Sequence, residues 1–281
     1  MPNHNSKYRS GRRNFSPAKS RNNQSGSRGR SFGAGKRFGG RSQPRGGGRF
    51  KLSPLDLSTF INKAAVITEK VEHFVPEHNF SDFNVNSTIL ATLEKTGYKQ
   101  PTPIQDKIIP HILAGRDVVG LANTGTGKTA AFLIPLIHKQ IGDKNKQVLI
   151  LTPTRELALQ IDQEFRVFSK GLGLYSVVCV GGANINLQIR ELRYFNNLVI
   201  GTPGRVIDLI NRKVLKLGEI DTVVLDEADQ MLDMGFVNDI KLIMSNVPDA
   251  RHTLCFAATM SPTIQALINK FLRDPITISV K

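Results

Sequence analysis

The sequence predicts an α/β fold in which helices flank a parallel β-sheet. Two observations carry this prediction: short apolar runs recur along the chain, and helix-like stretches alternate with them. The apolar runs are nearly continuous in Val, Ile and Leu, as expected of strands that are buried on both faces. Strands separated by helices form parallel sheets with right-handed crossovers, and such sheets bind ligands at the carboxyl ends of their strands.

The predicted elements follow one another after residue 78. We expect strands at 117–122, 148–152, 176–180, 198–201, 222–226 and 253–256. We expect helices at 128–140, 156–170, 205–211 and 236–246. Gly-rich or polar motifs come directly after most of these strands, which predicts that the motifs gather at one edge of the sheet.

The first 51 residues differ in composition from the rest of the chain. They hold 14 of the 38 Lys and Arg residues and no Asp or Glu, so the remainder carries 24 basic and 23 acidic residues. Such a Gly-, Arg- and Ser-rich segment has little apolar surface to bury, which predicts a disordered basic tail. Its Arg-Gly units and phenylalanines resemble RNA-binding tails, and a purely linking or solubilising tail is the alternative. Residues 52–77 are expected to form a linker or a short helical segment.

Several classes of protein are disfavoured by composition. The two cysteines, Cys179 and Cys255, lie in apolar strand-like runs, which favours buried thiols in a reducing compartment over a disulfide or a metal site. No apolar run approaches the roughly 18 residues of a membrane span, so we expect no membrane contact. The N-terminus lacks the apolar core of a secretory signal, and its Gly and Asn content fits a transit peptide poorly. We therefore expect a cytoplasmic protein.

The motif ANTGTGKT lies between a predicted strand and a predicted helix. Its glycines allow backbone N–H groups to surround a phosphate at a helix N-terminus. This arrangement predicts that Lys128 reaches the β- and γ-phosphates of ATP and that Thr129 ligates Mg²⁺. Alanine stands where the general P-loop pattern has its first glycine, and a chance Gly-rich turn is the alternative. The predicted nucleotide-binding residues of this loop are Ala122, Asn123, Thr124, Gly125, Thr126, Gly127, Lys128 and Thr129.

Two adjacent acids end the predicted strand 222–226. Acidic pairs are usually solvated surface features, but a pair that follows a buried strand downstream of a P-loop is typical of a Walker-B motif. Asp226 is then expected to hold Mg²⁺, and Glu227 is expected to position the attacking water. Lys128, Asp226 and Glu227 are the predicted catalytic residues, and Thr129 and Asp226 the predicted metal ligands.

The remaining motifs make the pattern specific. They are GYKQPTPIQ at 97–105 with Phe80 upstream, PTREL at 153–157, Gly181–Gly182, TPGR at 202–205, DEAD at 226–229 and AAT at 257–259. In order and spacing the region 78–281 resembles the first RecA-like, P-loop NTPase domain of DEAD-box RNA helicases. The resemblance implies that the Gln105 amide reads the adenine edge and that Phe80 stacks on the base. Taken alone, these two residues would be assigned to a helix surface and to the core.

The same resemblance implies contacts with the sugar-phosphate backbone of RNA. Hydroxyl, guanidinium and backbone N–H groups suit phosphates and read no bases, so low sequence specificity is expected. Each segment alone would be read as an ordinary turn or helix cap. The implied RNA-binding residues are Pro153, Thr154, Arg155, Gly181, Gly182, Thr202, Pro203, Gly204 and Arg205.

The chain departs from the family pattern in two respects. Ala257 replaces the usual serine of the coupling motif, which removes one hydroxyl that the family links to the acids of the DEAD box; coupling then depends on Asp229 and Thr259, or is weaker. The present sequence ends at Lys281, where the family continues with a second RecA-like domain, and this domain is expected in cis or in trans. Because that domain supplies arginine fingers worth about 10³–10⁵ in rate in related systems, we expect very slow hydrolysis by this chain alone.

These motifs indicate the N-terminal, ATP-binding half of an ATP-dependent RNA helicase that remodels RNA duplexes or RNA–protein complexes. The expected cofactors are ATP and Mg²⁺, and the expected partner is RNA. The alternative is a non-catalytic ATP- and RNA-binding module or an inactive fragment. The Q motif and the DEAD sequence disfavour a DNA-directed helicase.

Overall fold

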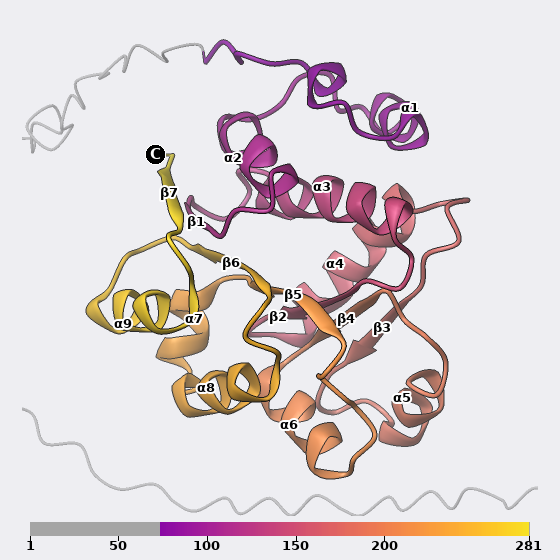
Figure 1. Cartoon of the computed structure of the whole chain (residues 1–281), viewed down its shortest axis with the longest axis vertical. Coiled ribbons are helices and arrows are strands. Elements are labelled where there is room, and N and C mark those ends of the chain that lie inside the picture. Colours follow the sequence, from indigo (N-terminus) through magenta and orange to yellow (C-terminus); the bar gives the residue numbers. More distant parts are fainter. Residues whose placement is uncertain (1–73, 281) are drawn as a thin grey trace, which may run out of the picture. The chain divides into compact units, whose positions relative to one another are not determined.

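The computed structural model describes residues 74–280, and these residues include a seven-stranded, fully parallel sheet (Figure 1). The strands lie in the order β3-β4-β2-β5-β6-β1-β7. Their bounds are β1 Val118–Leu121, β2 Gln147–Leu151, β3 Ser176–Cys179, β4 Leu198–Gly201, β5 Ile220–Leu225, β6 His252–Ala257 and β7 Ile276–Ser279. All six predicted strands are present, with bounds that differ from the expected ones by at most two residues.

Nine α-helices and one 3₁₀ helix accompany the strands within residues 74–280. They are η2 Phe80–Phe83, α1 Ser87–Lys95, α2 Pro103–Leu113, α3 Lys128–Gly142, α4 Arg155–Phe168, α5 Ile185–Glu191, α6 Pro203–Asn211, α7 Ala228–Asp233, α8 Val237–Asn246 and α9 Pro262–Phe271. The four predicted helices correspond to α3, α4, α6 and α8. The helix α3 continues through Pro135, an interior proline, as the predicted range 128–140 requires.

Helices cover both faces of the sheet, as the continuous apolar runs predict. One core cluster joins the sheet to α1, α2, α3 and α4, and a second joins it to α6, α7, α8 and α9 (Figure 1). Neighbouring strand residues alternate between the clusters: Val118 belongs to the first and Val119 to the second, and both side chains are fully buried. The α/β fold with a parallel sheet between helical layers is therefore confirmed.

The strand β7 was not predicted. It pairs only with β1, at the edge of the sheet, and its residues are alternately half-buried and exposed. A short strand of this kind lacks the continuous apolar run that marked the other six. Asp117 fixes the segment that leads into β7. Its carboxylate accepts hydrogen bonds from the backbone N–H groups of Thr253 and Arg273, both at 2.7 Å.

Other predictions concern the state of the cysteines, membrane spans and the N-terminal segment. Cys179 and Cys255 are buried free thiols. Between residues 74 and 280, every helix is too short or too polar to cross a bilayer. The predicted tail at 1–51 and most of the predicted linker at 52–77 lie outside the described residues.

Candidate functional site

The sequence motifs meet at the carboxyl edge of the parallel sheet, where the strand order sorts them into two groups. The P-loop follows β1 and the acidic pair follows β5, with β6 lying between these strands. We call this group the nucleotide half. The segments that begin at Pro153, Gly181 and Thr202 follow β2, β3 and β4, which are neighbours at the other end of the sheet. We call this group the RNA half, after the contacts that the sequence leads us to expect of it.

The P-loop turns tightly between β1 and α3. Gly125 and Gly127 have φ values of 83° and 91°, in the left-handed region that favours glycine. At Gly127 a Cβ atom would lie 2.5 Å from Nε2 of Gln105, so this position also lacks the space for a side chain. Lys128 begins α3, is only 6% exposed, and donates from Nζ to the carbonyl of Ala122 at 2.9 Å. The ammonium group is therefore held inside the loop that is expected to surround phosphates.

Gln105 lies directly against this loop. Its side chain is buried, accepts at Oε1 from the backbone N–H of Thr102 at 3.0 Å, and donates from Nε2 to the carbonyl of Gly127 at 3.1 Å. Phe80 is buried as well, and its ring centroid lies 6.2 Å from those of both Phe83 and Tyr98. The amide thus braces the P-loop and the ring belongs to the core cluster, while their contacts with adenine stay predictions.

The acidic pair lies at the end of β5, beside the P-loop. Asp226 is 2% exposed, and burial, together with the neighbouring Glu227 charge, raises its pKa to about 7 even though the Lys128 ammonium opposes the shift. Glu227 has φ 52° and ψ 50°, a left-handed conformation that costs a residue other than glycine on the order of 1–3 kcal/mol. Oε1 of Glu227 accepts from the Thr124 hydroxyl at 3.3 Å. This bond joins the acidic pair to the P-loop.

Asp229 links the same acidic segment to the end of β6. Its Oδ2 accepts from the backbone N–H groups of Ala258 at 2.8 Å and Thr259 at 3.0 Å, and from the Thr259 hydroxyl at 3.4 Å. Ala257 is fully buried, and its carbonyl accepts from the backbone N–H of Ala122 at 3.0 Å. The connection between the P-loop, β6 and the DEAD segment is therefore made without a hydroxyl at position 257.

In the RNA half, helix starts and turns present polar groups to solvent. The Thr154 hydroxyl caps α4 by accepting from the backbone N–H of Leu157 at 3.3 Å. Arg155 is exposed, and its guanidinium lies over Gly182, where it would collide with any Cβ atom. Gly204 is exposed in the first turn of α6. These groups are free to meet an extended anion.

Arg205 differs from Arg155. Its side chain is 13% exposed and donates from Nη1 to Oε1 of Gln188 at 2.9 Å and to the carbonyl of Ala183 at 3.4 Å. This geometry favours positioning of the turn that follows β3 over the direct phosphate contact expected from the sequence. Sequence reasoning missed Gln188, which also donates to the carbonyl of Val180 at 3.1 Å. A glutamine between Ile185 and Ile189, on the inward side of a short helix, was the available signal.

The nucleotide half fits a magnesium–triphosphate group. Mg²⁺ takes oxygen ligands and usually combines one or two carboxylates with phosphate oxygens. Here a single buried carboxylate, Asp226, faces a buried ammonium, Lys128, and the Thr129 hydroxyl follows on the same helix turn. The Asp226 carboxylate accepts from the Glu227 backbone N–H at 3.1 Å, and a divalent cation would stabilise its charged form against burial.

Comparisons with known proteins agree with this geometry. Residues 102–267 match the model of the DEAD/DEAH box helicase family. An ATP-dependent RNA helicase, DeaD, from Buchnera aphidicola is 44% identical over 204 residues, which cover 72% of this chain and 34% of that protein. The chain therefore spans about a third of the length of that curated relative.

Solved structures give the same picture. A DEAD box protein from the hyperthermophile Methanococcus jannaschii is 39% identical with a TM-score of 0.70, over 74% of this chain and 57% of that one. A hypothetical ATP-dependent RNA helicase from Sulfolobus tokodaii is 34% identical with a TM-score of 0.65, over 69% of this chain and 57% of that one. At these identities the likeness extends beyond the fold.

Proposed function

This chain belongs to the DEAD/DEAH box helicase family, and from that membership we propose that it is the ATP-binding part of an ATP-dependent RNA helicase. The observation that carries the proposal is the meeting of three distant segments. Gln105 bonds to the P-loop at Gly127, and the Lys128 ammonium acts electrostatically on the buried Asp226 carboxylate. A chance Gly-rich turn has no reason to lie between an amide and a buried acid.

Each residue of the nucleotide half has a proposed role in ATP hydrolysis. Lys128 leaves its bond with the Ala122 carbonyl to neutralise the β- and γ-phosphates, and the N–H groups of the loop hold the remaining oxygens. Asp226 and the Thr129 hydroxyl would hold Mg²⁺, which supplies charge neutralisation at the phosphates when bound. Glu227 orients the attacking water, and its bond with Thr124 keeps the carboxylate beside the loop.

The RNA half is proposed to hold the sugar-phosphate backbone of RNA. Arg155 and the Thr154 segment supply a charge and a helix N-terminus, and Gly182 and Gly204 supply accessible backbone N–H groups. Arg205 acts through the turn that it positions. Contacts of this kind read no base edges, so the binding is proposed to be independent of sequence.

We also propose a domain organisation for the chain. Residues 78–281 form the RecA-like ATP-binding domain, residues 52–77 a linker or short helical segment, and residues 1–51 a disordered basic tail that strengthens RNA binding through charge. A second RecA-like domain, in cis or in trans, completes both halves for remodelling of RNA duplexes or RNA–protein complexes. The free thiols of Cys179 and Cys255 support a reducing, cytoplasmic location.

The test is nucleotide binding and ATPase activity of the purified chain. We expect binding of a fluorescent ATP analogue with Mg²⁺, its loss in Lys128→Ala, and no loss in Lys241→Ala, a matched exposed lysine on α8. Hydrolysis is expected to be slow for the chain alone and to rise when a second domain and RNA, but not DNA, are added. Absence of ATP binding by the intact chain, or equal binding by Lys128→Ala, would contradict the proposal.

A further inference from the structure

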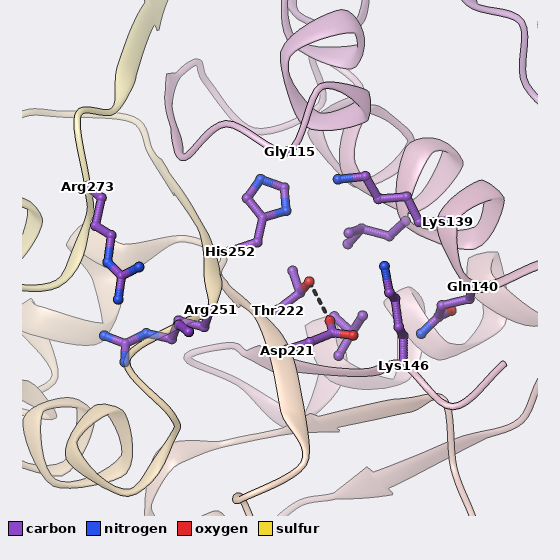
Figure 2. Close-up of a pocket in the computed structure, with 12 residues that line it drawn as sticks. Gly115, Lys139, Gln140, Lys146, Asp221, Thr222, Arg251, His252 and Arg273 are labelled. Carbon is purple, nitrogen blue, oxygen red and sulfur yellow. Dashed lines mark hydrogen bonds between the residues drawn. The ribbon is translucent and has the colours of Figure 1, made fainter. Parts of the chain in front are cut away.

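A cavity of about 370 Å³ lies at the amino edge of the sheet, away from both halves of the site above (Figure 2). It is lined from the starts of β2, β5 and β6 and from the end of α3. Lys128 begins α3 and Lys139 follows eleven residues later, which separates the two by about 16 Å along a helix. The cavity is thus distinct from the nucleotide half and independent of its proposed function.

Positive charge dominates the lining of this cavity. Lys139, Lys146, Arg251 and Arg273 line it, and Asp221 is the one carboxylate among its lining residues. Figure 2 shows Lys139 and Lys146 reaching from separate segments into the same space. Two ammonium groups held near each other repel, and the arrangement is one that an anion would relieve.

The two arginines donate to backbone carbonyls and add positive charge to the cavity without being its direct ligands. Arg251 donates to the carbonyls of Pro248 at 3.0 Å and Phe271 at 3.4 Å, and Arg273 donates to the carbonyl of Asp249. These bonds place both guanidinium groups at the ends of α8 and α9. The lysines, whose ammonium groups end flexible four-carbon stems, are therefore the groups available to contact a ligand.

The pKa values of the lining groups are shifted first by burial, and those of the basic groups are lowered further by neighbouring lysine charges. Burial, followed by the Lys146 charge, lowers the pKa of Lys139, while burial raises the pKa of Asp221. Burial and then the Lys139 charge lower the pKa of His252, against the Arg116 carbonyl and Asp117, which raise it. A dianion in the cavity would reverse the shifts of both basic groups.

His252 forms part of the cavity wall, and its pKa can report the charge of a bound anion. Its Nε2 lies 2.6 Å from the carbonyl of Arg116, so Nε2 carries the hydrogen and Nδ1 is the unprotonated nitrogen of the neutral ring. Nδ1 is buried and has no hydrogen-bond partner in the part of the chain that the structure describes. Burial and the Lys139 charge therefore favour the neutral ring, and negative charge added beside it would favour the protonated one.

We propose that this cavity binds a small phosphate-bearing anion, with the Lys139 and Lys146 ammonium groups as its direct ligands. Lysine is a common phosphate ligand because it offers a mobile point charge. The volume lies at the lower end of the range for small-molecule sites, which suits a compact anion. Leu136 and Val148 add apolar wall that could accept the ring of a sugar phosphate.

The first experiment measures affinity for pyrophosphate by calorimetry in a Lys128→Ala background, which removes the P-loop as a competing site. We expect Lys139→Gln with Lys146→Gln to weaken binding by about tenfold or more, as the loss of charge-assisted hydrogen bonds implies. The paired control is Lys107→Gln with Lys241→Gln, at exposed lysines outside the cavity, and it is expected to leave the affinity within about twofold. Unchanged binding after removal of Lys139 and Lys146, or no binding in the Lys128→Ala chain, would overturn the proposal.

Two further measurements separate the proposal from simple misfolding and identify the ligand. The thermal midpoint of the doubly substituted chain is expected to stay close to that of its parent, because the removed repulsion between Lys139 and Lys146 is offset by the loss of their attraction to Asp221. Tighter binding of AMP or ribose 5-phosphate than of pyrophosphate would assign the site to sugar phosphates, and the reverse order would assign it to inorganic anions. Either order supports the proposal.

The last measurement uses His252. Sulfate, whose charge is constant between about pH 5.5 and 8, is expected to raise the pKa of His252 in an NMR titration, and by reciprocity to bind more tightly as pH falls through that pKa. His252→Gln keeps a donor toward the Arg116 carbonyl but cannot titrate, so its sulfate affinity should change less with pH. A His252 pKa that does not move with sulfate would contradict binding beside this ring.

Discussion

The two halves of the carboxyl edge, which we propose bind different anions, differ in burial and backbone conformation. In the nucleotide half the charges of Lys128 and Asp226 are buried, and Glu227 adopts a left-handed conformation. In the RNA half Arg155 is exposed, and Arg205, the buried arginine, is used to hold a turn. Buried groups and a left-handed residue are thus concentrated in the half that we propose orients a compact triphosphate and a metal. An extended phosphate backbone needs only accessible charge and backbone N–H groups.

The largest expected effect comes from the buried charges of the nucleotide half. Lys128→Ala and Asp226→Asn should each lower RNA-stimulated ATP hydrolysis by more than about 100-fold, measured with a second domain present, because they remove electrostatic stabilisation in a site closed to water. Asp233→Asn, an exposed acid on α7, is the matched control and should retain activity. Comparable losses in the control would show that burial is not what distinguishes these charges.

The burial of Asp226 predicts that Asp226→Asn, which lowers activity, raises stability. Because the folded pKa of Asp226 is raised to about 7, the native state holds a proton that the unfolded state has lost between about pH 4 and 7. Stability of the nucleotide-free chain should therefore fall as pH rises through this window. Asp226→Asn should flatten that dependence and raise the free energy of unfolding at pH 8 by about 1–3 kcal/mol. Urea unfolding at pH 5 and pH 8 measures both, and a less stable Asn variant at pH 8 would contradict the account.

The two arginines of the RNA half should differ in what their replacement changes, RNA binding or stability. Arg155→Ala is expected to weaken RNA binding by about 5- to 30-fold and to leave the unfolding free energy unchanged, because its guanidinium is exposed. Arg205→Ala is expected to cost about 1–3 kcal/mol in unfolding free energy, since Oε1 of Gln188 and the carbonyl of Ala183 lose their donor. Salt-dependent RNA binding and urea unfolding of both variants test the pair. Equal stability losses would remove the distinction.

The smallest effect is expected at Ala257. The Asp229 carboxylate already accepts from Ala258 and Thr259, so Ala257→Ser should change strand separation per ATP by no more than about threefold, one modest hydrogen bond. Thr259→Ala, which removes a hydroxyl that donates to the Asp229 carboxylate, should have the larger effect of the two. A large gain from Ala257→Ser would mean that the missing hydroxyl limits coupling.

Much of the fold and of the nucleotide half could be predicted from local sequence. The strand residues form continuous apolar runs, and the P-loop and acidic pair each follow such a run directly, so their position at the carboxyl edge follows from parallel topology. The strand β7 could not be predicted in the same way, because an edge strand with one exposed face carries no such run.

Side-chain direction decided what local sequence could not. Arg155 and Arg205 both lie in the first turn of a helix that follows one of two neighbouring strands, and packing against Gln188 and Ala183 turns Arg205 inward. The basic cavity could not be predicted either, because Lys139, Lys146 and His252 come from three separate segments with no common motif.

The sequence by itself therefore determined the alternation of strands and helices, the phosphate-binding loop and the acids that follow β5. These depend on residues that are neighbours in the chain, where periodicity and turn chemistry act directly. Only the tertiary structure decided how deeply Asp226 and Lys128 are buried, which arginine is free and where a second group of cations gathers. Those properties arise from contacts between segments far apart in the sequence, since burial and electrostatic environment are set by the assembled fold.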